Sequence, residues 1–192
     1  MDVVINDDVI FAALPYDEGR NLYLAESVAA VLQVKTTMDS RSLGQSLENL
    51  ATSAQLRKRH AKGEMRIMSQ FDKASAEIIR CFVFAFDATV HLTTLRIAFR
   101  DYYAAQKTAP EEQASGLAVL NLGMVANYPP GYDKGGVKIG GEVKRGVVAL
   151  ETEGDTLFHF LTHLLFEMPQ VVYRPPVLTE YLRSQSYPTH AD

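Results

Sequence analysis

Apolar residues recur with helical spacing through the first half of the chain. Over 43–61 they return every three or four positions, which predicts an amphipathic helix that begins near Ser40 or Ser42. Alanines and leucines over 22–34 predict a further helix before it, although the closing letters VLQVKTT also fit an extended chain. The first third of the chain is therefore expected to be mostly helical.

The middle of the chain carries the longest apolar run. Helical spacing continues from Glu64 to about Gln106, and over 78–99 the apolar residues lie on nearly all sides. A helix that is apolar on all sides is typical of the centre of a protein. We therefore predict a long central helix, with a break near 69–73 or 93–94, and a short helix that reaches about Leu122.

The two ends of the chain favour strands. β-branched residues follow Met1, and two further β-branched runs flank Gly140-Gly141, a pair typical of tight hairpin turns. A three-residue loop would place Ile139 opposite Val143. An amphipathic helix follows, from Asp155 or Thr156 to about Glu167.

These elements predict an α+β fold that is predominantly α-helical. A long central apolar helix would pack with a small antiparallel sheet made from the N-terminal strand and the 137–150 hairpin. We expect one domain over 1–192, with a helical core at about 22–122. The hairpin, the last helix and an extended arm that bears prolines would occupy 127–192.

Composition agrees with a protein that has a hydrophobic core. Hydrophobic residues make up 47% and charged residues 22% of the 192 positions. The one cysteine, Cys81, lies in the apolar run, where a core position is expected and an internal disulfide is excluded. The acidic N-terminal segment does not resemble a secretory signal, and charges interrupt the apolar run. We therefore expect an intracellular, cytoplasmic protein that is not secreted and has no membrane span.

Charge is concentrated in the middle of the chain. Residues 55–107 carry ten basic and five acidic side chains, although the whole chain has a net charge of −4. The densest basic cluster consists of Arg57, Lys58, Arg59, Lys62 and Arg66. Such a cluster can contact nucleic-acid phosphates or an acidic partner, and it can equally be the solvated end of a helix.

The segment 127–146 is rich in glycine and proline. Its glycines lack the lysine and hydroxyl residue that a phosphate-binding loop requires, so a nucleotide loop is not favoured. Pro129, Pro130 and Tyr132 fit the P-P-x-Y pattern that WW-type domains bind. Pro175 and Pro176 form a second pair. Both proline pairs are candidate contacts for a proline-motif-binding partner. For the first pair, a simple turn is the alternative.

Two groups of residues have spacings that suit chemistry. His159, His163 and Glu167 recur every fourth position, so they share one side of the last predicted helix and could hold a metal. The alternative is an ordinary polar helix face. No catalytic set and no cofactor is predicted, because no nucleophile can be placed beside a base.

The sequence favours a non-enzymatic protein that self-associates. We expect a homo-oligomeric structural or interaction protein of the shell, matrix or capsid-associated type, including a viral or phage origin. One alternative is a nucleic-acid-binding protein that uses the cluster over 57–66. The other is a metal-dependent hydrolase that uses His159, His163 and Glu167.

Overall fold

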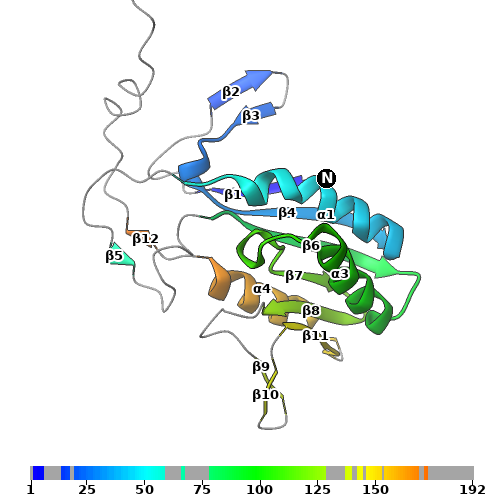
Figure 1. The fold of residues 1–192 in the computed structure, drawn as a ribbon. Helices are drawn as coiled ribbons and strands as arrows, with labels where there is room; N and C mark the ends of the chain where they lie inside the picture. Colours follow the sequence, from blue (N-terminus) through cyan, green and yellow to red (C-terminus); the bar gives the residue numbers. More distant parts are fainter. Residues whose placement is uncertain are drawn as a thin grey trace, which may run out of the picture.

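A computed structural model of the chain shows three layers, with a mixed sheet between helices (Figure 1). It describes residues 2–6, 14–17, 20–58, 66–67, 78–128, 137–139, 142–144, 146–152, 154–168 and 171–172.

The sheet has six strands in the order β1-β4-β6-β7-β8-β11. Its strands are β1 (Asp2–Asn6), β4 (Val28–Met38), β6 (Arg80–Ala88), β7 (Gly116–Val119), β8 (Gly123–Tyr128) and β11 (Gly146–Leu150). Strands β4, β6 and β7 run parallel to one another, and every other neighbouring pair is antiparallel. The parallel strands therefore form the middle of the sheet.

Among the described residues, three small strand pairs lie outside this sheet. They are β2 (Leu14–Asp17) with β3 (Arg20–Leu22), β5 (Arg66–Ile67) with β12 (Val171–Val172), and β9 (Val137–Ile139) with β10 (Glu142–Lys144).

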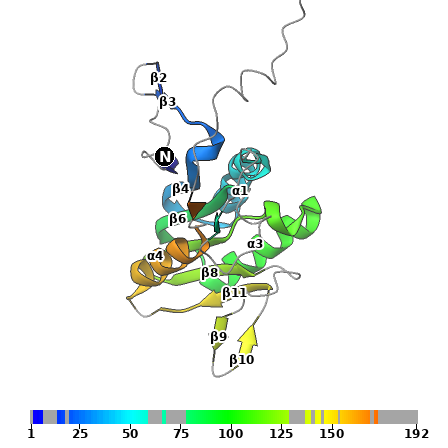
Figure 2. The same ribbon diagram turned by 90° about the vertical axis from the view of Figure 1, so that its left-hand side faces the viewer.

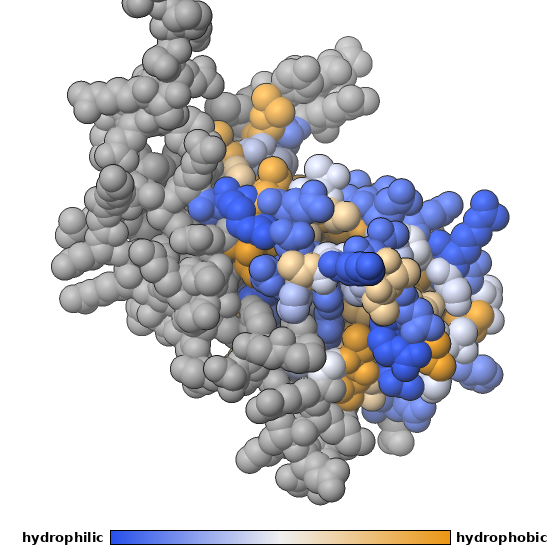
Figure 3. Space-filling model, in the orientation of Figure 1, coloured by the Kyte–Doolittle hydropathy of each residue, from blue (hydrophilic) through white to orange (hydrophobic). Residues whose placement is uncertain are grey.

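Helices cover both faces of the sheet. Figure 2 shows α1 (Ser40–Gln55) and α3 (Leu92–Gln106) on one side and α4 (Thr156–Glu167) on the other. Two short 3-10 turns, η1 (Ala25–Ser27) and η2 (Pro110–Glu112), complete the described elements. The face that carries α1 and α3 is mostly hydrophilic on its outer surface (Figure 3).

Each face of the sheet has its own hydrophobic core. Between the sheet and α1 and α3, the core includes Leu43, Leu47, Val83, Leu95, Phe99 and Leu117. Between the sheet and α4, it includes Ala30, Phe82, Phe84, Met124, Phe160 and Leu164. Strand β6 contributes alternate residues to both cores, so its side chains are buried on the two faces.

The prediction of a predominantly helical fold is wrong, and the central helix is the main error. Residues 80–88 are strand β6, and the helix begins only at Leu92. A strand buried on both faces has a continuous apolar run, which periodicity alone does not separate from a buried helix. The segment has no alternation because both of its sides face apolar neighbours.

The helix predicted over 22–34 is also wrong. After η1, the chain forms the eleven-residue strand β4, which pairs with β1 and β6. Its alanines, leucine and glutamine favour a helix in isolation, but tertiary pairing overrides that preference. The short helix predicted before Leu122 is replaced by η2 and β7.

The predicted small sheet is only partly correct. The N-terminal strand and the Gly140-Gly141 hairpin both exist, but β1 belongs to the six-stranded sheet and β9–β10 forms a separate pair. Ile139 lies opposite Glu142, the register of a two-residue loop, so the predicted three-residue loop is wrong. Residues 146–150 form β11 at the far edge of the main sheet.

Two predicted helices are present, although α1 ends at Gln55 rather than near residue 61. Helix α1 begins after Asp39, whose carboxylate accepts a hydrogen bond from the backbone of Ser42 while the Ser42 hydroxyl accepts one from the backbone of Asp39. This reciprocal cap fixes the start of the helix. Helix α4 spans Thr156–Glu167, as the sequence predicts.

The core position predicted for Cys81 is confirmed. Its thiol is buried beneath α1, and this burial raises its pKa to about 12. A thiol with that pKa stays protonated at neutral pH and is a poor nucleophile. None of the helices in the described part of the chain is long and apolar enough to cross a membrane.

Candidate functional site

Strand pairing brings two polar side chains together at one edge of the sheet. Asp2, the first residue of β1, lies opposite Gln33 of β4 in the antiparallel register. The Gln33 amide nitrogen donates a hydrogen bond of 2.9 Å to the Asp2 carboxylate. The two residues are 31 positions apart and the β2–β3 pair lies between them, so the contact exists only when β1 and β4 pair.

Lys35 lies on the same face of β4 as Gln33. Side chains two positions apart on a strand point the same way, with Cα atoms roughly 7 Å apart. Val31, which shares this alternation, packs into the core beneath α1 and α3. Asp2, Gln33 and Lys35 therefore face the α1 side of the sheet, and we call them the Asp2 cluster.

Gln33 combines burial with an unused acceptor. Its residue is 4% exposed, and among the described residues no donor reaches its Oε1 atom. A buried carbonyl oxygen without a hydrogen bond is costly, and such groups commonly mark a place for a water, an ion or a ligand. The neighbouring Asp2 carboxylate is exposed and adds further oxygen acceptors.

These oxygens suit a hard divalent cation. Mg²⁺ is commonly held by one or two carboxylates, with waters and substrate phosphates completing its shell. Asp2 and Gln33 supply one carboxylate and one amide oxygen. In the described part of the chain, no group of three His, Cys, Asp or Glu residues could hold a metal. One carboxylate and one amide oxygen would leave most of the shell to waters and substrate, so the cluster fits an open magnesium-type site.

Sequence analysis missed the Asp2 cluster because it assigned β4 to a helix. On a strand, VLQVK places Gln33 and Lys35 on one face and Leu32 and Val34 on the other. Two polar residues on one face of an otherwise apolar strand would have indicated a candidate site. The partner Asp2 lies far away in sequence, and no local spacing relates the two.

A second polar group lies under α4. Arg80 and Glu167 are both buried, with Arg80 Nε 3.7 Å from Glu167 Oε2. His163 Nε2 lies 3.2 Å from the carbonyl oxygen of Ser115. Burial, with a smaller effect of the Glu167 carboxylate, raises the pKa of the Tyr128 hydroxyl to about 12. These contacts join α4 to the sheet.

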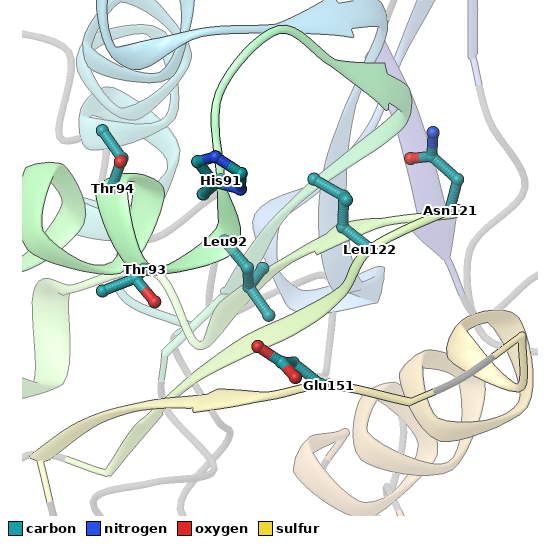
Figure 4. A pocket seen from close by; sticks show the side chains of 7 residues that line it. All are labelled: His91, Leu92, Thr93, Thr94, Asn121, Leu122 and Glu151. Carbon is teal, nitrogen blue, oxygen red and sulfur yellow. The ribbon is translucent and has the colours of Figure 1, made fainter.

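Seven residues line an open cavity of about 510 Å³ near the start of α3 (Figure 4). They are His91, Leu92, Thr93, Thr94, Asn121, Leu122 and Glu151. At its margin, the Asn121 amide donates a 2.7 Å hydrogen bond to Asp87. No member of the Asp2 cluster lines this cavity.

The three residues predicted to hold a metal lie on α4 but differ in environment. His159 is exposed, whereas His163 and Glu167 are buried against the sheet. His163 contacts Ser115, and Glu167 pairs with Arg80. Two of the three side chains therefore already have protein partners.

The predicted basic cluster is not one continuous helix end. Helix α1 ends at Gln55, and Arg57 then forms a 2.6 Å ion pair with Glu112. Lys58 is buried. The backbone of Arg66 lies in β5, while Arg59 and Lys62 lie outside the described residues. Pro129, Pro130, Tyr132, Pro175 and Pro176 also lie outside the described residues.

No protein-family model and no curated protein sequence matches this chain. Its mixed α/β fold is, however, similar to solved structures of an enzyme class, the NucC nucleases. Apo NucC of E. coli MS115-1 shares 12% identity at a TM-score of 0.56, over 94% of this chain and 73% of that one.

Two further structures contain cAAA. NucC of P. aeruginosa ATCC27853 with cAAA bound shares 16% identity at a TM-score of 0.58, over 96% of this chain and 70% of that one. NucC of E. coli MS115-1 with cAAA bound shares 14% identity at a TM-score of 0.58, over 94% and 68%. At these identities the similarity establishes the fold.

This similarity corrects the predicted function. The sequence favoured a non-enzymatic structural protein of the shell, matrix or capsid-associated type, whereas the solved structures that share the fold are nucleases. The prediction that the chain is not an enzyme is contradicted by the same finding. The prediction relied on the absence of a local catalytic motif, and that absence does not exclude a site assembled from two distant strands.

Proposed function

We propose that this chain is a divalent-metal-dependent nuclease whose reaction centre is the Asp2 cluster. The observation that carries the proposal is the buried Gln33 side chain, whose Oε1 has no donor among the described residues and whose amide nitrogen binds the Asp2 carboxylate. The similarity to NucC nucleases supports the reaction class. Hydrolysis joins a water oxygen to phosphorus, breaks one P–O ester bond and transfers a proton to the leaving alkoxide.

Each residue of the cluster has a role in this proposal. The Asp2 carboxylate and the Gln33 amide oxygen would hold the cation, which supplies Lewis acidity and lowers the pKa of water when bound. The Lys35 ammonium, two positions along β4, would neutralise charge that develops on the phosphate oxygens. The Gln33–Asp2 hydrogen bond orients the carboxylate before substrate arrives.

The direct test is cleavage of nucleic acid by the purified chain. Double-stranded DNA, single-stranded DNA and RNA are incubated with Mg²⁺ or with EDTA, each with and without cAAA. The cAAA arm is included because two of the similar structures hold it. We expect Mg²⁺-dependent cleavage in at least one arm and none in EDTA. Intact substrate in every Mg²⁺ arm would refute the proposal.

We also infer that copies of this chain associate through the outer side of α4. Five large apolar side chains of this helix are between 45% and 69% exposed. They are Leu157, Phe158, Leu161, Leu165 and Phe166. Together they form a patch on the order of 500 Å², near the upper end for a typical monomer.

A second copy is the occupant that best fits this patch. Residues 156–166 include no Asp, Glu, Lys or Arg, so two copies can meet without like-charge repulsion. A further exposed apolar side chain, Phe86, lies on the same side of the sheet, because it contacts Phe84, which contacts Phe160 of α4. Exposed apolar patches of this size typically mark a surface that a partner covers.

Charged substitutions on α4 should reduce the native mass. We expect Phe158→Glu combined with Leu165→Glu to convert an oligomer to a monomer, because each copy would then bury two carboxylates. Multi-angle light scattering after size exclusion measures the mass. Ile97→Glu, on the exposed side of α3, is the matched control and should leave it unchanged. A wild-type monomer at high concentration would contradict the inference.

A further inference from the structure

The Asp2 cluster is electrically balanced before any ligand arrives. Asp2 contributes one negative charge, Lys35 one positive charge, and Gln33 none. The cluster therefore has oxygen atoms that can bind a cation, but its three described side chains carry no net negative charge.

The cluster also holds its shape without a cation. The Gln33 amide donates to Asp2, so the two side chains attract one another. Two adjacent carboxylates would instead repel each other and would need a cation between them. Gln33 therefore lets the cluster keep its arrangement without a cation, but it lacks the negative charge that would attract one.

We propose that the divalent cation and the nucleic-acid phosphodiester bind the Asp2 cluster cooperatively, each supplying the charge that the other lacks. A doubly charged cation beside Asp2 and Lys35 leaves an excess of positive charge, which a phosphodiester offsets. The free protein thus binds the cation weakly and the complex binds it tightly. This inference rests on the proposed nuclease function.

Linkage makes the effect symmetrical. If nucleic acid raises the affinity for the cation by some factor, the cation raises the affinity for nucleic acid by the same factor. Couplings between sites are commonly about 5- to 150-fold. Because the two ligands would share one contact shell here, we expect at least about tenfold, within that common range.

The coupling can be measured without catalysis. Isothermal titration calorimetry gives the dissociation constant of Mn²⁺ for the free protein and for the protein saturated with a phosphorothioate oligonucleotide, which resists cleavage. We expect the Mn²⁺ dissociation constant to fall at least about tenfold in the complex. Fluorescence anisotropy of a labelled oligonucleotide, with and without Mn²⁺, should return the same factor.

Two substitutions test the charge argument by different routes. Gln33→Glu adds a negative charge and Lys35→Met removes a positive one, so each leaves the cluster with one net negative charge. We expect both to strengthen Mn²⁺ binding to the free protein by about tenfold and to reduce the coupling. Gln45→Glu and Lys107→Met make the same changes at exposed positions outside the cluster and should have little effect.

The outcomes separate this inference from the proposed function. Cleavage of nucleic acid together with an Mn²⁺ affinity that the oligonucleotide leaves unchanged would overturn the coupling alone. An oligonucleotide that is neither bound nor cleaved would overturn both. Equal effects of Gln33→Glu and Gln45→Glu would show that general charge, rather than the cluster, governs the cation, and would also overturn the inference.

Discussion

Replacing Asp2 by asparagine should lower the rate of nucleic-acid cleavage by about a hundredfold or more, because a cation loses its one carboxylate in the cluster. The amide oxygen of asparagine can still accept the hydrogen bond that Gln33 donates to Asp2. The pairing of β1 with β4 should therefore survive. Initial cleavage rates with Mg²⁺ measure the effect, and circular dichroism checks the fold.

The matched control for this substitution is Asp101→Asn. Asp101 is an exposed carboxylate on α3 that contacts Arg100, far along the chain from the Asp2 cluster. Its loss should change the rate less than about twofold, in keeping with the small effects of exposed ion pairs. If the Asp2→Asn variant and the wild type, purified in the same way, cleave at equal rates, the reaction centre is not the Asp2 cluster.

Truncating Phe82 should destabilise the protein by about 3–5 kcal/mol, the usual cost for a fully buried phenylalanine. Phe82 is fully buried in β6 and makes edge contacts with Phe160 and His163 of α4. Phe82→Ala removes these contacts and leaves a cavity between the sheet and the helix. Equilibrium unfolding in urea, followed by circular dichroism, measures the change in free energy.

Phe86 on the same strand provides the comparison. It is 53% exposed, so Phe86→Ala should cost less than about 1 kcal/mol. Both variants are measured at one protein concentration, because association through α4 would add to apparent stability. Similar losses for the two variants would contradict the burial pattern of β6.

The sequence was sufficient to place α1, which packs its apolar side on the sheet and exposes its polar side. It also places the ends of α4, although the exposed side of that helix is apolar and its buried side carries His163 and Glu167. In α1, buried Leu43, Leu47 and Leu50 alternate with exposed polar residues, and a cap at Asp39 marks its start. In α4, Asp155 and Met168 flank the apolar run. Local patterns of this kind determine a helix without knowledge of its neighbours.

The central strands could not be predicted in the same way. Strand β6 lies between two parallel neighbours and between two helical layers, so its run of buried residues lacks a polar side. That environment is a property of the assembled sheet, and a single segment does not contain it. Strand β4 is harder still to predict, because its residues favour a helix in isolation and become a strand only through pairing with β1 and β6.

The same limit applies to the candidate site. Gln33 and Lys35 become neighbours on one face only when their segment is extended, and Asp2 joins them only through the pairing of β1 with β4. Searches for spacing within one helix instead favoured His159, His163 and Glu167. A contact between residues 31 positions apart leaves no periodic trace in the sequence.

The strand that supplies Asp2 is at an edge of the described sheet, with a neighbour only on its β4 side. Edge strands open more readily than interior ones, because half of their backbone N–H and C=O groups face outward and pair with no neighbouring strand. Each brief detachment of β1 carries the carboxylate away from Gln33 and also withdraws Ile5 from the core beneath α4. The fraction of time that β1 stays paired with β4 therefore sets an upper bound on how often a molecule is competent for cleavage, separately from its global stability.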